Sequence, residues 1–362
     1  MRRFEVSTMK IKFKKMNRNM LTYLMVTAAF LLCHLAMSGW IDGFKMSRSL
    51  KGQLVPICVY IVMAVSLNLT VGISGELSLG HAGFMSVGAF SGILMSHWLP
   101  SVFPGSAPLV RLILALIFGG VIAAIAGVLI GIPVLRLRGD YLAIVTLAFG
   151  EIIRNLINCV YFSIEGSEIH FSFLSPDIPG TMVINGPMGA TGIKKLATFN
   201  MGFALVIFTL FVVLNLINSR TGRAIKACRD NRIAAESVGI NVTQYKMIAF
   251  VVSAALAGMA GSLYALNYSA IQAAKFKFDT SILVLVFVVL GGIGNIRGSI
   301  IAATVLTVLP EMLRQFGNYR MLVYAIVLII VMLAGNSVAL KNAIDRIIPA
   351  FGKKKEKDGE QA

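Results

Sequence analysis

Long apolar runs with few charges recur along this chain and leave it few ways to fold. The run at 109–135 carries one charged residue, Arg111, and the run at 200–218 carries none. A helix of about 20 predominantly apolar residues spans the hydrocarbon core of a bilayer. Of the 362 residues, 57% are hydrophobic and 14% are charged, which is too apolar a composition for a soluble domain of this length. The sequence therefore predicts an all-α integral membrane protein.

Ten segments are predicted to cross the membrane. They lie at 20–38, 54–72, 77–97, 109–135, 141–162, 200–218, 246–268, 281–291 with its continuation, 299–313 and 321–338. An even number of crossings places both termini on one side. Both ends are rich in Lys and Arg, which concentrate in cytoplasmic segments. The expected organisation is a basic cytoplasmic tail at 1–19, a transmembrane domain at 20–340 and a charged cytoplasmic tail at 341–362.

The net charge of +17 is also explained by Lys and Arg in cytoplasmic segments. Lys and Arg cluster in the first tail, at 220–246 and in the last tail, which are flanks and connections of apolar runs, so no nucleic-acid partner is expected. The segment at 219–245 is predicted to be cytoplasmic. The segment at 163–199 is predicted to be an irregular external loop with a short helix or hairpin, because it is rich in Pro and Gly.

Two apolar segments are interrupted by glycine and polar residues. The first is NLTVGISGELSLGHAGF at 68–84, and the second is GGIGNIRG at 291–298. Non-helical backbone at membrane depth is tolerated only where protein buries it or where it lines a water-filled cavity. A pair of such segments is typical of the binding site of a transporter. The broken-helix residues of the second segment are Gly291, Gly292, Gly294, Asn295 and Gly298.

A basic, helix-prone island at 221–241 lies between two apolar runs. One interpretation is an amphipathic helix on anionic lipid headgroups. The other is a docking element for a cytoplasmic partner, because the island is rich in small residues that allow close approach of two backbones. Small residues also recur within the apolar runs at Gly88/Gly92, Gly127/Gly131 and Ala254/Gly258/Ser262, where they predict close helix packing.

Four groups of motifs occur in order along the chain. They are SLNLTVG (66–72) with LSLGHAGF (77–84), GDYLAIVTL (139–147) with EIIRN (151–155), TGRAIKACRD (221–230) and VLGGIGNIRGS (289–299). In these residues the chain resembles the Liv-type branched-chain (hydrophobic) amino acid permeases of bacterial ABC importers. The resemblance implies the importer permease fold in the inner membrane, with about 10 transmembrane helices, some of them interrupted.

The resemblance also implies partners: a homologous second permease, two cytoplasmic ATP-binding cassette ATPases and an external solute-binding protein. ATP would bind only to the ATPases, so no cofactor is expected on this chain. In the family, the loop that contacts the ATPase contains Glu-Ala-Ala, three residues and Gly. Ala234, Ala235 and Gly239 fit this spacing, whereas Ile233 stands where the glutamate would be.

Two sets of site residues follow. The predicted substrate path, where a broken helix offers free backbone groups to an amino acid, comprises Asn68, Ser74, Gly75, Ser78, Leu79, Gly80, His81 and Phe84. The predicted ATPase-coupling set comprises Gly222, Arg223, Arg229, Arg232, Ala234, Ala235 and Gly239. The arginines are expected to pair with acidic groups of the ATPase. Close helix packing is the alternative explanation for the small residues at 68–84.

Glu151 and Arg154 are charged residues within an apolar run, three positions apart on one helix face. They are predicted to form an ion pair with a structural or a gating role. Glu151 also allows an alternative function from a different class, a secondary carrier driven by protons or sodium. Such a carrier needs a carboxylate inside the helix bundle, and Glu151 is the candidate. Within the importer class, urea, short amides and simple sugars are the alternative solutes.

No motif of an enzyme is present. The sequence has no Gly-x4-Gly-Lys-Ser/Thr loop for ATP, no His-Glu-x-x-His pair, and no Gly-x-Ser-x-Gly elbow. The four cysteines have no spacing typical of a disulfide or a metal site. We therefore expect a transport subunit with neither a catalytic residue nor a metal.

Overall fold

The computed structural model describes residues 20, 22–35, 48–103, 105–137, 139–166, 168–173, 179–319 and 322–329. The tails predicted at 1–19 and 341–362 lie outside these residues. The chain divides into two compact units, Met1–Thr307 and Val308–Ala362. All contacts discussed below lie within the first unit. The described part of the second unit contains the end of α11, the 3₁₀ helix η4 (Leu313–Tyr319) and a helix at 322–329.

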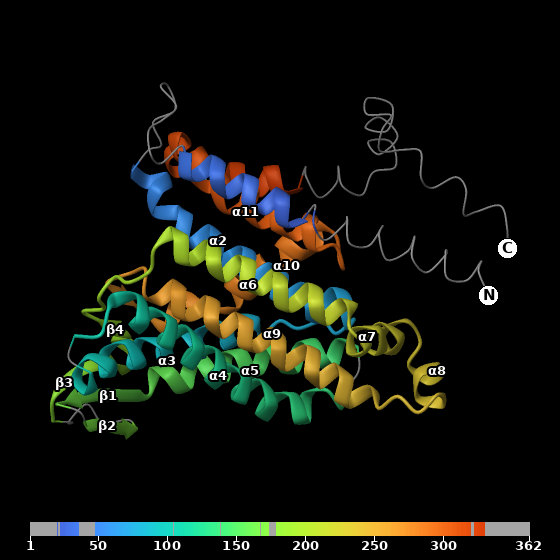
Figure 1. Ribbon diagram of the computed structural model, residues 1–362, viewed down its shortest axis with the longest axis horizontal. Coiled ribbons are helices and arrows are strands. Elements are labelled where there is room, and N and C mark those ends of the chain that lie inside the picture. The colour runs from blue at the N-terminus through green and yellow to red at the C-terminus, as the bar shows by residue number, and fades with distance from the viewer. Residues whose placement is uncertain are drawn as a thin grey trace. The chain divides into compact units, whose positions relative to one another are not determined.

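Helices dominate the described residues (Figure 1). A first helix covers Thr22–Leu35. It is followed by α2 (Arg48–Asn68) with η1 (Leu69–Ile73), α3 (His81–Val102), α4 (Pro108–Val134), α5 (Asp140–Asn158), α6 (Phe199–Asn218), α7 (Arg220–Asp230), α8 (Arg232–Ser237), α9 (Val242–Ala265), α10 (Phe278–Gly291) and α11 (Ile296–Met312). Short 3₁₀ segments η2 (Gly186–Met188) and η3 (Ala273–Phe276) lie in the connections.

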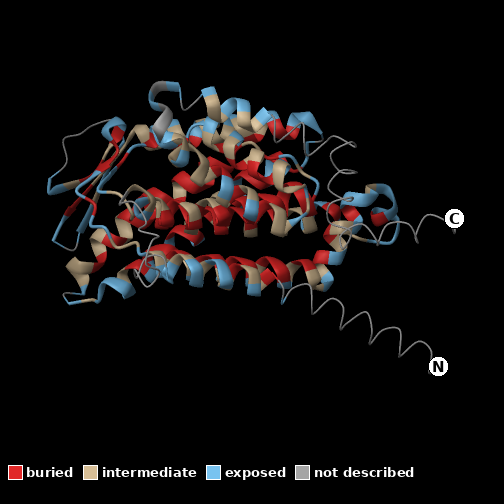
Figure 2. Cartoon of the chain, turned by 90° about the horizontal axis from the view of Figure 1, so that it is seen from above, coloured by how far each residue is buried: buried red, intermediate tan, exposed pale blue. Residues whose placement is uncertain are grey.

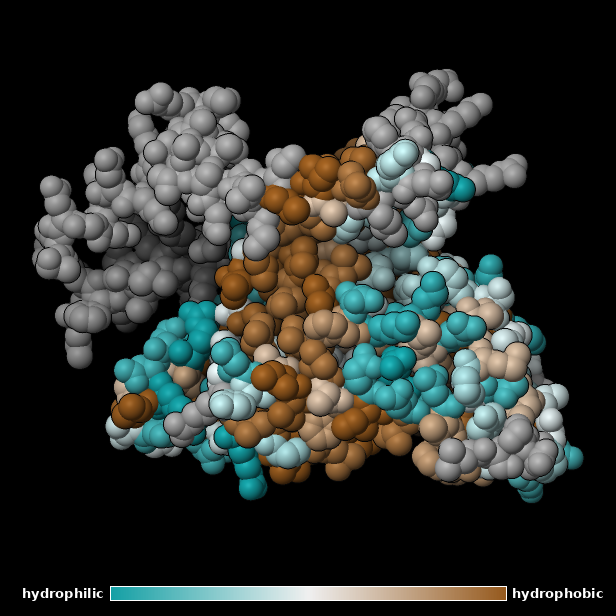
Figure 3. Space-filling model, turned by 180° about the vertical axis from the view of Figure 1, so that it is seen from behind, coloured by the Kyte–Doolittle hydropathy of each residue, from teal (hydrophilic) through white to brown (hydrophobic). Residues whose placement is uncertain are grey.

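Five helices are long and apolar enough to cross a membrane, namely Ser49–Ile73, α3, α4, α6 and α9. The first helix and α10 are shorter apolar helices. Along α4, large hydrophobic side chains are exposed at alternating spacings of four and three residues: Leu114, Phe118, Val121, Ile125, Val128 and Ile132. A stripe of this kind on one helix face suits contact with lipid. Figure 3 shows apolar residues gathered over the middle of the helices. The predicted multi-pass membrane protein is confirmed.

The core lies where α3, α4 and α9 cross, α2 packs on α9, and α6 packs on α2. Buried residues follow the inward faces of these helices (Figure 2). Glycine brings the backbones together, because a Cβ on Gly88 would lie 2.1 Å from the Gly258 carbonyl oxygen and one on Gly261 would lie 1.9 Å from that of Met85. The close packing predicted from the small residues of α3 and α9 is confirmed.

The segment predicted as an irregular external loop contains most of a small antiparallel sheet. Its strands are β1 (Val160–Glu165), β2 (Glu168–Phe173), β3 (Thr181–Asn185), β4 (Ala190–Thr191) and β5 (Ala270–Ile271), in the order β2-β1-β3-β4-β5. The helix predicted at 141–162 was too long, since α5 ends at Asn158. Val160, Tyr161 and Phe162 are β-branched or aromatic residues that favour a strand.

The sheet and the basic island lie at opposite ends of the long helices (Figure 1). At the sheet end, β5 joins the α9–α10 connection to β4, and the Leu196 N–H donates to the Leu266 carbonyl. At the other end lie α7, α8, the break between α2 and α3, and the turn between α10 and α11.

Candidate functional site

The α2 helix ends in a π-helical turn, and the chain is non-helical at 74–80 before α3 begins at His81. The helix predicted to begin at 77 therefore begins four residues later. Ser74 N donates to Leu69 O over 3.1 Å, and Glu76 N donates to Thr70 O over 3.1 Å, so the turn widens before it ends. Gly75 then adopts φ +76°, a conformation that favours glycine. π-Turns of this kind are frequent at functional sites.

The non-helical segment is held by α2, α5 and α10. His81 Nε2 lies 2.8 Å from Ser66 Oγ on α2, and Leu79 N donates to Thr146 Oγ1 on α5 over 3.0 Å. At the start of α3, Ala82 N donates to Ser281 Oγ on α10 over 3.0 Å. Protein therefore buries Ser74, Ser78 and Gly80 of this irregular segment, as an apolar environment requires, whereas Gly75 and Leu77 are exposed.

Most of the predicted substrate-path side chains are buried against this framework. Phe84 packs edge-on against Phe250, with ring centroids 5.4 Å apart. Gly80 allows close approach of α5, because a Cβ there would lie 2.2 Å from the Thr146 carbonyl oxygen. Gly75 is exposed and Leu79 is half-buried, whereas the other six predicted residues are buried. Contact of these residues with a solute stays a prediction.

Three buried hydroxyls of this segment have no hydrogen-bond partner among the described residues. They belong to Thr70, Ser74 and Ser78, each no more than 2% exposed. Leaving a buried hydroxyl unpaired costs about 1–3 kcal/mol, so these groups favour a bound water or solute. Thr70 was not among the predicted site residues. Thr70 could have been identified as a polar residue that lies one helical turn before Ser74 in the same apolar run.

The second interrupted segment packs directly on the first. After α10 the chain turns through Gly292 and Gly294, which have φ +91° and φ +82°. Gly294 N donates to Asn68 Oδ1 over 2.8 Å, while Asn68 Nδ2 donates to Ser299 Oγ over 2.8 Å. A Cβ on Gly72 would lie 2.4 Å from Gly294 N. Asn68, predicted to line a path, therefore joins the two breaks.

The remaining broken-helix residues close this turn. Asn295 N donates to Gly292 O over 2.9 Å. A Cβ on Gly298 would lie 1.7 Å from the Gly291 carbonyl oxygen, so the end of α10 and the start of α11 are in backbone contact.

The basic island folds into α7 and α8, each with a polar N-cap. Ser219 Oγ accepts from Gly222 N over 3.1 Å, and Asn231 Oδ1 accepts from Ala234 N over 3.0 Å. Gly239 ends α8 at φ +81°, and the next amide, Ile240 N, donates to Ala235 O over 3.0 Å. This arrangement is the usual glycine-terminated end of a helix.

Several small residues of the island have a local structural role. Cys228, Ala235 and Val242 form a small core between α7, α8 and α9. Burial raises the pKa of the Cys228 thiol above its ordinary value. A Cβ on Gly222 would lie 2.2 Å from the Leu216 carbonyl oxygen. Arg223, Ala234 and Gly239 remain exposed, and Arg232 is half-buried.

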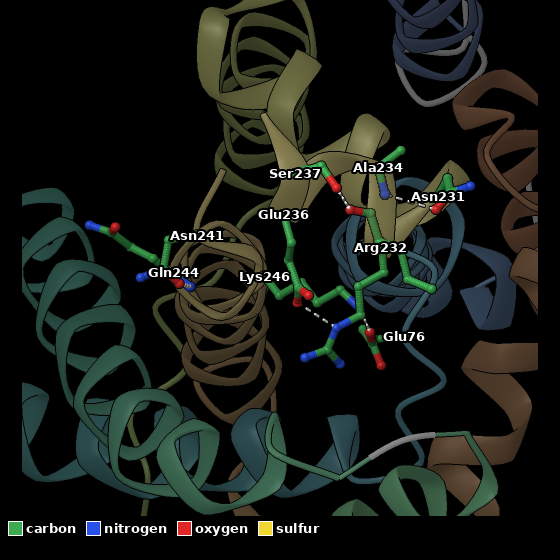
Figure 4. A network of polar contacts seen from close by, with 10 residues as sticks. Glu76, Asn231, Arg232, Ala234, Glu236, Ser237, Asn241, Gln244 and Lys246 are labelled. Atoms are coloured by element: carbon green, nitrogen blue, oxygen red, sulfur yellow. Dashed lines mark hydrogen bonds and ion pairs between the residues drawn. The ribbon is translucent and has the colours of Figure 1, made fainter. Parts of the chain in front are cut away.

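All three predicted coupling arginines have partners within the chain. Arg223 Nη1 donates to the Asn218 carbonyl over 3.5 Å. Arg232 Nε donates to Glu236 Oε1 over 2.9 Å (Figure 4). Arg229 Nη1 donates to the Gly72 carbonyl over 2.7 Å, and its Nη2 pairs with Asp230 Oδ1 at 2.9 Å. Lys246, in the second turn of α9, forms an ion pair with Glu76 (Figure 4). The island and both breaks therefore meet at one junction.

Glu151 and Arg154 form an ion pair on α5, with Arg154 Nη2 2.7 Å from Glu151 Oε2. The other carboxylate oxygen of Glu151 accepts from Phe278 N over 3.3 Å. Phe278 is the first residue of α10, where an acidic group is favoured by the helix dipole. Glu151 thus joins α5 to α10.

A family model described as the branched-chain amino acid transport system permease component matches residues 49–332. The chain belongs to this family. The permease is 34% identical over 324 residues to the high-affinity branched-chain amino acid transport system permease protein LivM of Salmonella typhimurium, covering 80% of this chain and 69% of the relative. It is 33% identical over the same length and the same shares to LivM of Escherichia coli.

Relatives with other names share less of the sequence. The fructose import permease protein FruG of Bifidobacterium longum is 24% identical over 305 residues, which cover 76% of this chain and 86% of the relative. No solved structure matches the permease. The family places the chain among transport permease components, and the expected resemblance to Liv-type permeases is confirmed.

An apolar cavity of about 590 Å³ lies elsewhere in the permease, between α3, α4, α5 and the sheet. Ser91 and Trp98 are the lining residues with a polar N–H or O–H group, and the Ser91 hydroxyl already donates to the carbonyls of Val87 and Gly88. The lining residues include no charged side chain that could pair with a zwitterionic amino acid. No group of three possible metal ligands occurs in the part of the chain that the structure describes.

Proposed function

We propose that this chain is the transmembrane permease subunit of an ATP-driven importer that moves branched-chain or other hydrophobic amino acids by alternating access. The observation that carries the proposal is the junction at which α7, the α2–α3 break and the α10–α11 turn are hydrogen-bonded together. An importer needs its energy-receiving element to be connected to the part of the membrane domain that rearranges. Membership of the family and the names of its LivM relatives support the same function.

The proposed topology has ten crossings within a permease domain at 20–340, with both termini in the cytoplasm. The coupling segment at 219–245 would face the cytoplasm, and 163–199 would face outside. Support comes from the excess of Lys and Arg in the tails and island, and from the sheet lying at the end opposite α7 and α8. The LivM relatives favour the bacterial inner membrane as the location.

The proposed partners are a second, homologous permease, two cytoplasmic ATPases and an external solute-binding protein. The island presents two large apolar side chains to solvent, Ile233 at 77% exposure and Val238 at 75%. Exposed apolar groups in a polar, basic segment suit a protein interface better than bulk water. We assign them to the contact with the ATPase. ATP would bind and be hydrolysed there, and not on this chain.

The solute would pass beside 74–84. A zwitterionic amino acid needs donors for its carboxylate and acceptors for its ammonium group, and a broken helix offers both from its backbone. The unpaired hydroxyls of Thr70, Ser74 and Ser78 would become available when the segment moves. A simple sugar is the second candidate solute, because a relative named as a fructose import permease aligns over most of its length.

Reconstitution of the complete complex in proteoliposomes tests the function. With both permeases, the ATPases and the binding protein present, ATP inside and labelled solute outside, we expect leucine uptake that stops without ATP. Omission of the ATPases is the matched control. Uptake that follows a proton or sodium gradient and ignores ATP would establish a secondary carrier instead. ATP-driven uptake of fructose but not leucine would establish the second candidate.

A further inference from the structure

We propose that Arg229 and Lys246 are positioning residues that fasten the basic island to the α2–α3 break, so that movement of α7 and α8 is transmitted to residues 74–80. This proposal rests on the proposed function and adds to it the route of coupling. The family motif in the island accounts for contact with an ATPase. It does not account for these two side chains, which point back into the chain's own broken helix.

Arg229 contacts three residues, Gly72, Asp230 and Gly75. Its Nη1 donates to Gly72 O over 2.7 Å, while Nε and Nη2 donate to Asp230 Oδ1 over 3.1 and 2.9 Å, which fixes the plane of the guanidinium. The stem of Arg229 crosses Gly75, because a Cβ on Gly75 would lie 2.6 Å from Arg229 Cγ. Gly75 is therefore required both for its φ of +76° and for the passage of the arginine.

The chemistry of the Arg229 contact favours a firm attachment. Gly72 lies in the last turn of η1, where backbone carbonyls lack partners within the helix and carry partial negative charge. A hydrogen bond from a charged donor to such a carbonyl is stronger than one between neutral groups. The guanidinium thus caps the end of the α2–η1 helix from outside that helix.

Lys246 makes the second attachment. Its ammonium group pairs with Glu76, and the two side chains are only 13% and 12% exposed, so water screens the pair weakly. Gly72 and Glu76 lie on either side of Gly75. Arg229 precedes α8 and Lys246 follows it, so the exposed α8 is anchored on both sides to the same short segment.

The segment that these attachments act on lies between two helices. Residues 74–80 are non-helical, so they can move without breaking a helical hydrogen-bond ladder. Movement there also reaches the second break, because Gly72 touches Gly294 and Asn68 binds the Gly294 amide. A shift of α8 would displace both breaks together.

The test measures uptake and ATP hydrolysis in parallel in the complete complex in proteoliposomes. For Arg229→Gln we expect the ATPases to copurify as in the wild type and hydrolysis to continue. Uptake per ATP hydrolysed should fall at least tenfold, because movement of α7 and α8 is no longer transmitted to residues 74–80. Arg229→Lys, which keeps the charge without the planar fork, should show a smaller loss. The matched control is Arg111→Gln, in the first turn of α4 and far from the basic island. This variant should behave as the wild type.

Charge reversal tests the second attachment and separates coupling from folding. Glu76→Lys and Lys246→Glu should each lower uptake per ATP, and the double exchange should recover at least half of the wild-type value. An unchanged ratio in Arg229→Gln, or no recovery in the double exchange, overturns the proposal while leaving the importer intact. Loss of ATPase copurification in Arg229→Gln would also overturn it, since Arg229 would then act in docking. A wild-type complex with no ATP-driven uptake instead refutes the proposed function.

Discussion

The side-chain oxygen of Asn68 accepts a 2.8 Å hydrogen bond from the backbone N–H of Gly294, which lies 226 residues further along the chain. The amide nitrogen of Asn68 donates to Ser299 Oγ at the same distance. One buried side chain thus holds the two interrupted segments together, using both of its polar atoms. The arrangement makes Asn68 a structural centre of the site.

Replacement of Asn68 by leucine should destabilise the permease and abolish uptake. Gly294 N would lose its partner, and an unpaired buried group costs about 1–3 kcal/mol. Ser299 Oγ would lose the bond from Asn68 but keep its bond to the Asn295 carbonyl. Asn68→Asp keeps an acceptor for Gly294 N and should lose less. Thermal unfolding in detergent measures the stability. A wild-type melting temperature for Asn68→Leu would contradict the role given to this residue.

Gly72→Ala should prevent the two breaks from approaching each other. The added Cβ would lie 2.4 Å from Gly294 N and 1.9 Å from Asn68 Oδ1, and neither group can move far. Gly52→Ala on the same helix is the control, since nothing lies within 4 Å of its Cβ. Alanine there should stabilise the helix by about 0.5–1 kcal/mol. The yield and melting temperature of the two variants should differ in opposite directions from the wild type.

Gly239→Val should disrupt the end of α8 through the backbone alone. The φ of +81° is costly for a β-branched residue, although no atom lies within 4 Å of the Cβ position. We expect ATP-driven uptake and ATPase coupling to be lost while binding-protein docking persists. Charge reversal of the exposed Arg223 should have the same result if it meets an acidic group of the ATPase. Unchanged uptake in both variants would remove the island from the coupling path.

Lysine in place of Ile233 and Val238 should weaken assembly with the ATPase without affecting the fold. Both side chains are more than 70% exposed, so substitution leaves the interior intact. Copurification of the ATPase should fall, and the melting temperature of the permease alone should stay constant. Met188→Lys, 62% exposed in η2 near the sheet, is the control and should leave ATPase binding at the wild-type level.

Glu151→Gln should lower stability by about 1 kcal/mol or less and should leave uptake dependent on ATP. The ion pair is partly exposed, with Arg154 at 22% and Glu151 at 31%, and such pairs contribute little. The neutral amide can still accept from Phe278 N. Uptake measured with and without a proton gradient provides the check. A variant that loses a dependence on that gradient would support a secondary carrier.

The sequence was sufficient for the features that depend on local residue types. Apolar runs identified most helices to within a few residues, and glycine with serine marked both breaks. The wrong helix boundaries predicted from the sequence also have local causes. The helix at 141–162 was extended through Val160 and Tyr161, because an apolar aromatic run suits a strand as well as a helix. The start at 77 was too early because Leu77 and Leu79 continue the apolar pattern through backbone that Gly75 has already turned.

The tertiary structure decided which of these features meet. Hydropathy and glycine content determined a membrane protein with broken helices and a basic island, since they depend on burial and backbone freedom within a few residues. Arg229 was expected to reach an ATPase, yet it binds a carbonyl 157 residues away. No local pattern encodes that partner, because a hydrogen bond forms only when packing of distant helices brings donor and acceptor within about 3 Å.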